Sequence, residues 1–165
     1  MKITVFMTAL FAALALTFSG CTKSAAAQEG IMTLQEIQDR TEIRSLVDKY
    51  ALESDRYNQE GYREIFTSDL NLRIIVGEKI REIHGVDKMV KIYKAAGDTK
   101  VSFHQVGQQV VEFTDSTHAT GTTYLTALLG NDTVAQMFIR YEDKFEKIDG
   151  RWWITDRDQI IVHSK

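Results

Sequence analysis

The stretch that decides the fold is YEDKFEKIDGRWWITDR, residues Tyr141–Arg157. The Asp-Gly pair at its centre suits the tight turn of a β-hairpin, because both residues tolerate a positive φ angle. The aromatic and β-branched residues on either side favour extended strands. We therefore predict two long antiparallel strands, over Thr133–Lys147 and Arg151–Val162.

The residues that precede this hairpin repeat the same pattern. Two more strand candidates, Val101–Phe113 and Thr117–Leu129, are followed by TDS and GND, which both suit turns. The chain contains no proline, so no strand is excluded on that ground. The second half of the chain is therefore predicted to be a meander of four long strands.

The first half of the domain begins with helical patterns. Thr33 and Glu36 have the spacing of a capping box, which predicts that a helix begins at Leu34. Apolar residues at helical spacing extend this helix to about Ser54. A second, shorter helix fits NQEGYREIF, with Asn58 as its cap.

The pattern then changes to short strands and back to a helix. LNLRIIV and KIREIHG form a predicted hairpin around Gly77, and a third helix follows over VDKMVKIYKAA, with Gly97 as its stop. This order of elements is typical of an α+β fold. Long antiparallel strands twist and coil. We therefore expect a strongly curved sheet that wraps around the helices as a cone, with a pocket between them.

The N-terminal residues MKITVFMTALFAALALTFSGC have the pattern of an export signal: one basic residue, an apolar run and a small-residue segment. SGC resembles a bacterial lipobox, in which the thiol of Cys21 is acylated. We expect a signal peptide over 1–20, a flexible tether over 21–30 and one domain over 31–165. The resemblance implies a lipoprotein of the bacterial cell envelope, anchored to the membrane and facing the periplasm. A plain secretory signal that is cleaved elsewhere is the alternative.

Composition narrows the classes of partner. The chain has 20 basic and 23 acidic residues, a net charge of −3, and no strong basic cluster, so nucleic acid is not expected as a partner. The four histidines show no metal-ligand spacing, and no phosphate-binding glycine motif is present. The only cysteine would be consumed by lipidation, which leaves none for a disulfide.

The predicted order and several motifs resemble the SnoaL-like branch of the NTF2-like superfamily. The resemblance rests on EIRSLVDKYALESDRYNQEGYREIFTSDL, IHGVDKMVKIY, HQVG and the closing hairpin, and it covers Thr33 to about Val162. It implies an NTF2-like cone. The superfamily includes dehydratases, isomerases, cyclases, hydrolases and non-catalytic binding domains, so fold alone does not give function.

The resemblance also implies three site residues. Dehydratases of this branch use a tyrosine and an aspartate from the first helix region and a histidine from the first long strand, which correspond here to Tyr50, Asp55 and His104. Eliminating water next to a carbonyl needs a base, an acid and a donor to the developing enolate. A histidine oriented by a carboxylate, together with a neutral phenol, meets these needs without a cofactor or metal. The second histidine of some dehydratases is absent, because GTTYLTA offers only Thr123 or Tyr124.

Each of these residues also has a structural interpretation. Tyr50 lies on the apolar stripe of its helix and suits the core. Asp55 lies where an acidic residue often caps the next helix, and His104 suits a hydrogen-bonded structural histidine. Arg157 either holds an anionic group of a substrate or forms an exposed salt bridge on the sheet. The alternation of residues breaks near Gly107, so the sequence does not show which face of that strand lines the pocket.

Two functions from different classes remain open. One is a cofactor-free dehydratase or isomerase that acts on a small hydrophobic, cyclic substrate through His/Asp/Tyr acid–base chemistry. The other is a non-catalytic module of the cell envelope that binds a small hydrophobic ligand or a partner protein. Apolar residues on both faces of YLTALL and VAQMFI predict in addition a homodimer.

Overall fold

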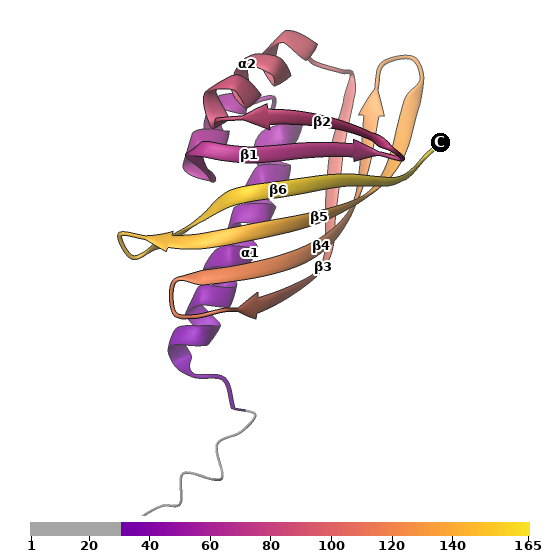
Figure 1. Cartoon of the computed structure of the whole chain (residues 1–165). Coiled ribbons are helices and arrows are strands. Elements are labelled where there is room, and N and C mark those ends of the chain that lie inside the picture. Colours follow the sequence, from indigo (N-terminus) through magenta and orange to yellow (C-terminus); the bar gives the residue numbers. More distant parts are fainter. Residues whose placement is uncertain (1–30) are drawn as a thin grey trace, which may run out of the picture. The chain divides into compact units, whose positions relative to one another are not determined.

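The structure is a computed structural model that describes residues 31–165 (Figure 1). The predicted signal peptide, the tether and the predicted lipidation site Cys21 lie outside these residues. None of the helices in this part of the chain combines the length and the apolar character needed to cross a membrane.

Two α-helices, one 3-10 helix and six strands make up this part of the chain, and the fold is the expected α+β cone. The sheet has the order β2-β1-β6-β5-β4-β3, and all neighbouring strands are antiparallel except β1 and β6. The four long strands of the meander lie within two residues of their predicted positions. The elements are α1 (Leu34–Asp55), η2 (Gln59–Glu64), β1 (Phe66–Val76), β2 (Lys79–His84), α2 (Val86–Ala96), β3 (Val101–Phe113), β4 (His118–Gly130), β5 (Val134–Ile148) and β6 (Arg151–Ser164).

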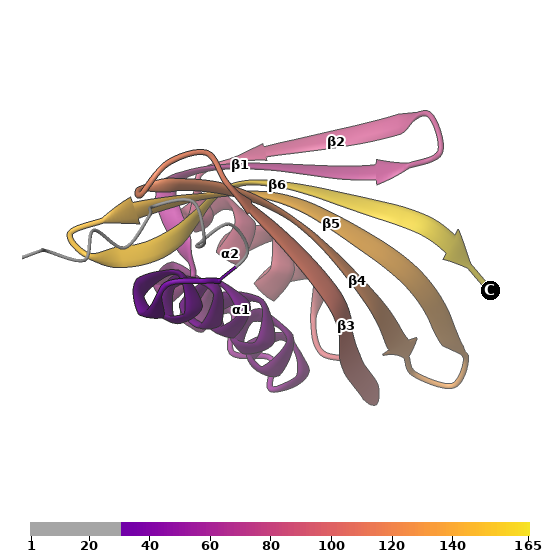
Figure 2. The same cartoon turned by 90° about the horizontal axis from the view of Figure 1, so that it is seen from below.

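Helix α1 begins as the sequence predicts. The hydroxyl of Thr33 accepts a hydrogen bond from the backbone N–H of Glu36 at 3.1 Å, which satisfies one of the free N–H groups of the first turn. The helix lies against the concave face of the sheet, beside β3 (Figure 2). The apolar part of its buried stripe ends with Tyr50 and Ala51, so the last turn, which carries Asp55, lies at the rim of the core.

The second predicted helix is a single short 3-10 segment, η2, and Asn58 lies at its N-cap position as predicted. Asn58 makes no side-chain cap, because its amide donates instead to the carboxylate of Glu53 at the end of α1. Gly61 lies against the same carboxylate, and a Cβ atom there would come within 2.8 Å of it. Glu53 therefore holds this segment tightly against α1.

A register shift in β3 settles which of its residues face the helices. The pairing of β3 with β4 shifts between Val106 and Gln109, which confirms the predicted break near Gly107. His104 and Val106 face the helices before the shift, and Gln109 and Val111 do so after it. The extra residue of the bulge thus lets both ends of a long strand present their side chains to the core.

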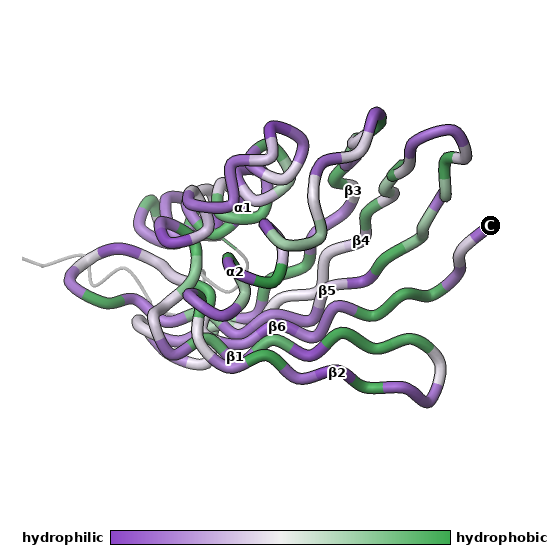
Figure 3. The backbone as a smooth tube through the Cα atoms, turned by 90° about the horizontal axis from the view of Figure 1, so that it is seen from above, coloured by the Kyte–Doolittle hydropathy of each residue, from purple (hydrophilic) through white to green (hydrophobic). Residues whose placement is uncertain are grey.

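The core lies between the helices and the concave face of the sheet. It is built mainly from aliphatic side chains and from a group of aromatic rings where α1, η2, β1 and β5 meet. Figure 3 shows hydrophobic colour along the C-terminal halves of β1 and β6, in agreement with the apolar run IIV that each of them contains. Arg157 of β6 is a charged residue that is nevertheless fully buried in the core.

Candidate active site

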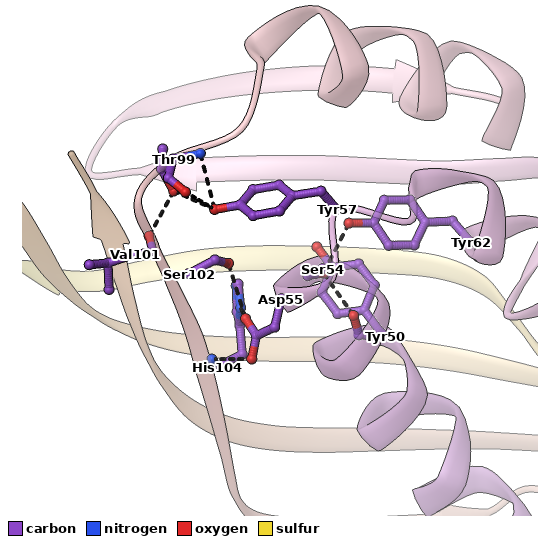
Figure 4. A network of polar contacts seen from close by, with 9 residues as sticks. All are labelled: Tyr50, Ser54, Asp55, Tyr57, Tyr62, Thr99, Val101, Ser102 and His104. Carbon is purple, nitrogen blue, oxygen red and sulfur yellow. Dashed lines mark hydrogen bonds and ion pairs between the residues drawn. The ribbon is translucent and has the colours of Figure 1, made fainter.

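The structure joins Asp55 and His104, which are 49 positions apart in the sequence (Figure 4). Nδ1 of His104 lies 2.6 Å from Oδ1 of Asp55, and the backbone N–H of His104 donates to Oδ2 at 3.0 Å. One carboxylate therefore holds both the ring and the backbone of the same residue. A charge-assisted pair of this kind fixes the orientation of the ring strongly.

Helix α1 and strand β3 supply the two halves of this pair. Asp55 is the last residue of α1, and Ser102 and His104 project from the same face of β3 because strand side chains alternate. The hydroxyl of Ser102 donates to Oδ1 of Asp55 at 3.1 Å. The carboxylate thus accepts three hydrogen bonds from β3. The alternative that Asp55 caps the next helix is wrong, because η2 has no side-chain cap.

The other ring nitrogen of His104, Nε2, is not used in the contact with Asp55. A carboxylate can only accept, so Nδ1 carries the proton that points to Asp55, and in the neutral ring Nε2 bears a lone pair. Nε2 has no hydrogen-bond partner among residues 31–165. The side chain of His104 is 10% exposed and that of Asp55 25%, so the pair lies at the rim of the core. This is the arrangement of a general base with its orienting acid.

Tyr50, the third expected residue, lies deeper in the core. Its ring packs against Tyr62, Phe66 and Tyr141, with centroids 5.2, 5.7 and 5.8 Å away. No hydrogen bond joins its hydroxyl to Asp55 or His104 in this part of the chain. The structure thus brings two of the three residues into direct contact, and it leaves Tyr50 as a neighbour within the aromatic group.

A second phenol, Tyr62, belongs to the same group. Its hydroxyl lies 2.9 Å from the hydroxyl of Ser54, which donates to the backbone carbonyl of Tyr50 at 2.7 Å. Burial raises the pKa of Tyr62, so this phenol stays neutral at ordinary pH. Figure 4 shows this chain of contacts next to the pair of Asp55 and His104.

Arg157 forms a salt bridge, but the expectation that this bridge is exposed is wrong. Arg157 is 0% exposed and binds Asp143 of the neighbouring strand through two hydrogen bonds, at 2.7 and 2.8 Å. Burial lowers the pKa of Arg157, but the charge of Asp143 outweighs it, and the net pKa lies above the ordinary value. The guanidinium therefore stays cationic. It lies over the rings of Tyr141 and Tyr50, at 4.0 and 4.7 Å from their centroids.

The connection between α2 and β3 is fastened near the pair. The hydroxyl of Tyr57 donates to the carbonyl of Thr99 at 2.6 Å, and it accepts from the backbone N–H of Thr99 at 3.0 Å. Tyr57 holds this position with φ 54°, a left-handed conformation that costs free energy for a residue with a side chain. This clamp fixes the start of β3 just before Ser102 and His104 (Figure 4).

The best-formed clefts lie elsewhere on the molecule. The four best-formed clefts among residues 31–165 have volumes of about 400 to 910 Å³, and none of these four is lined by Tyr50, Asp55 or His104. The largest lies between β1, the start of α2 and the β5–β6 hairpin. Within the described residues, no group of three or more His, Cys, Asp or Glu side chains is placed to hold a metal ion.

Three contributors to the site were missed from the sequence. Ser102 could have been found from its position two residues before His104 on one strand face. Asp143 is the partner of Arg157 only because the β5–β6 register places them opposite each other. Tyr62 lies in the short second helix, and no local signal marks its hydroxyl.

Comparison with known proteins identifies the family. The SnoaL-like domain family matches residues 35–158 of the chain. No curated protein matches the sequence.

Solved structures of low sequence identity share the fold. A candidate scytalone dehydratase from Novosphingobium aromaticivorans superposes with a TM-score of 0.73 at 17% identity, covering 81% of this chain and 91% of the other. The hexachlorocyclohexane dehydrochlorinase LinA-type3 from Novosphingobium barchaimii superposes with a TM-score of 0.69 at 14% identity, covering 80% and 92%. A protein of unknown function from Mycobacterium tuberculosis reaches 0.66 at 21% identity, covering 82% and 78%.

Proposed function

This chain belongs to the SnoaL-like domain family, and we propose that it is a cofactor-free dehydratase or isomerase for a small hydrophobic, cyclic substrate. The observation that carries the proposal is the 2.6 Å contact between Nδ1 of His104 and Asp55, which leaves Nε2 as a base. Two structural relatives are named for eliminations, one of water and one of hydrogen chloride. The names of these two proteins support the proposal. Because their sequence identity to this chain is low, the comparison shows a shared fold and no more.

In the proposed reaction, Nε2 of His104 removes a proton from the carbon next to a carbonyl of the substrate. The electron pair of that C–H bond forms an enolate, and Asp55 stabilises the resulting imidazolium. When the carbonyl re-forms, the hydroxyl on the next carbon leaves, taking the proton from His104 and departing as water. Tyr50 is the proposed donor to the enolate oxygen. An isomerase would return the proton to a different carbon of the same substrate.

The sheet around His104 suits an apolar substrate. His104 lies opposite Ala127, which pairs in turn with Met137. The adjacent inward row consists of aliphatic side chains that belong to the core or pack on its edge. These are Val106, Leu125, Ile139 and Ile161.

The test is turnover of a panel of cyclic β-hydroxy ketones, followed by the absorbance of the conjugated enone that forms. We expect the wild-type chain to be active and His104→Ala to lose about 10²–10⁴-fold in kcat. Ser54→Ala is a matched control, because the hydroxyl of Ser54 contacts Tyr50 and Tyr62 and makes no hydrogen bond to the side chain of Asp55 or His104. Equal rates for the wild type and His104→Ala would remove the catalytic role of His104.

A second candidate function is supported by the packing around Tyr50. The rings of Tyr50 and Tyr141 and the side chain of Arg157 fill the interior next to the pair, and the four clefts do not reach it. A non-catalytic module would need no open site at this pair, because it could bind a small ligand in one of these clefts or a partner protein on its surface. Saturable binding of cyclic ketones without any turnover would favour this function.

We also propose that the protein is a lipoprotein of the cell envelope and a homodimer. The export signal and the lipobox-like SGC support an anchor at Cys21 that faces the periplasm. Exposed apolar side chains on the convex face of the sheet support a second copy as partner. They include Phe103, Tyr124, Phe138 and Val162. Light scattering of the purified protein at micromolar concentration tests the dimer, and a monomer there would contradict it.

A further inference from the structure

Two buried polar atoms on the inner face of β6 have no hydrogen-bond partner. These are Nη1 of Arg157 and Oε1 of Gln159. Among residues 31–165, Oγ1 of Thr67 is the only other buried side-chain polar atom left in this state. An unpaired buried polar group is unfavourable, so native proteins usually supply it with a partner. Two such atoms two positions apart on one strand indicate a missing group.

Both side chains point to the same side of the sheet. Residues two apart on a strand share a face, and Arg157 faces the aromatic group around Tyr50. Gln159 lies opposite Tyr141 of β5, whose ring covers the guanidinium of Arg157. The remaining nitrogens of that guanidinium, Nε and Nη2, are held by Asp143. Nη1 is therefore left to bind something else.

The chemistry of the two atoms specifies that group. Nη1 of Arg157 can only donate a hydrogen bond, and Oε1 of Gln159 can only accept one. A single oxygen that satisfies both must accept and donate at once, which is the property of a hydroxyl group. A chlorine, an ether or a carbonyl oxygen has no proton to donate, so each of them would leave Oε1 of Gln159 unpaired.

We propose that Arg157 and Gln159 bind the hydroxyl group of a ligand, so that the site selects a hydroxylated ring over a chlorinated one. That this ligand is the substrate rests on the proposed function. The inward row of Leu125 and Ile139 lies between the row of His104 and the row of Gln159. Gln159 then acts as a specificity residue and makes no direct contribution to the proton transfer.

Three matched probes test the inference with the full-length protein in mild detergent. Phenol donates and accepts, anisole only accepts, and chlorobenzene does neither well. Binding measured by NMR titration should favour phenol over both others by at least about tenfold, because a site built around a hydroxyl rejects analogues that lack it. In Gln159→Leu and in the closer isostere Gln159→Met this preference should fall to about twofold or less.

Gln109→Leu is the control, since Gln109 lies on the same inward row and its amide already donates to Thr123 at 3.2 Å. This variant should keep the preference for phenol. The ligand-free Gln159→Leu protein should melt no lower than the wild type, because the change removes an unpaired buried oxygen.

Equal binding of the three probes to the wild type would overturn the inference and would mean that the two atoms hold only an interior water. Retention of the phenol preference in both Gln159 variants would also overturn it. These outcomes are separate from the proposed function. If the protein turns over β-hydroxy ketones but shows no preference for phenol, the elimination stands and the hydroxyl site is rejected. If it prefers phenol but turns over no β-hydroxy ketone, the hydroxyl site stands and the elimination is rejected.

Discussion

The carboxylate of Asp55 binds His104 at two atoms, the ring Nδ1 at 2.6 Å and the backbone N at 3.0 Å. The second contact matters because it fixes the strand as well as the ring. The last turn of α1 is thereby joined to the first residues of β3, and Ser102 adds a third hydrogen bond. The pair of Asp55 and His104 is both a candidate catalytic group and a structural link between α1 and β3. Substitutions of Asp55 can distinguish these two roles.

Asp55→Asn should preserve the link between α1 and β3 but change the tautomer balance of the His104 ring. The asparagine oxygen can still accept from one donor, so we expect a loss of stability of about 1 kcal/mol or less. The Nδ1–H form of His104 loses its charged partner, so ¹⁵N NMR of the ring should show a changed balance of the two tautomers and kcat should fall. Asp55→Ala should lose about 1–3 kcal/mol in urea unfolding, because it leaves the donors of β3 unpaired. Wild-type activity in Asp55→Asn would argue that Asp55 has a structural role alone.

Removing Arg157 should destabilise the protein strongly. Arg157→Met leaves Asp143 as an uncompensated buried charge, which costs about 3–5 kcal/mol. The double variant Arg157→Met/Asp143→Leu should recover most of this loss in urea unfolding. The solvent-facing pair of Arg73 and Asp158 is the control, and its removal should change the urea midpoint only slightly, because water screens an exposed ion pair. Similar losses for the two pairs would contradict the buried position of Arg157.

Tyr57→Phe should loosen the segment that leads into β3. The change removes the hydrogen bonds between the phenol and Thr99 and leaves the ring in place, so we expect a loss of about 1–2 kcal/mol. Hydrogen exchange at the amides of Thr99 to Ser102 should become faster, while exchange in the β5–β6 hairpin stays unchanged. Unchanged exchange at Thr99 would show that the clamp does not hold this segment.

Asp39 should make the stability of the folded protein depend on pH in the acidic range. Burial raises the pKa of Asp39, but hydrogen bonds from Lys147, Trp152 and Gln35 outweigh it, and the net pKa lies below the ordinary 3.8. A group whose pKa is lowered on folding contributes stability above its unfolded pKa, and this contribution is lost as the pH falls through the folded value. Urea midpoints of the wild type should therefore fall more steeply below about pH 4 than those of Asp39→Asn. Parallel curves for the two proteins would contradict this.

Cys21→Ala should release the protein from the membrane. If the thiol is acylated, the variant should move from the membrane fraction to the soluble fraction, and the melting transition of the domain should stay the same. Metabolic labelling with a tagged fatty acid in the native bacterium checks the chemistry directly. An unlabelled wild-type protein would rule out the lipid anchor.

The sequence alone determined the features that depend on neighbouring residues. The turn at Asp149 and Gly150 has φ angles of 51° and 81°, as an Asp-Gly hairpin turn requires, and the capping box at Thr33 is present. The break near Gly107 was visible as a loss of alternation. Asp55 and His104 were brought together by resemblance to a family, since no local rule connects positions so far apart.

Only the tertiary structure decided the environment of each polar side chain. The sequence suggests that Arg157 is an exposed strand residue. The register of β5 and β6 instead places Asp143 opposite it, and the ring of Tyr50 from α1 covers its guanidinium. The parallel pairing of β1 with β6 likewise depends on contacts between distant segments. Turn and cap preferences depend on residues that are close together in the chain, so they can be predicted from the sequence. Burial and pairing of charges depend on which distant segment packs on top, and that is decided only when the whole chain folds.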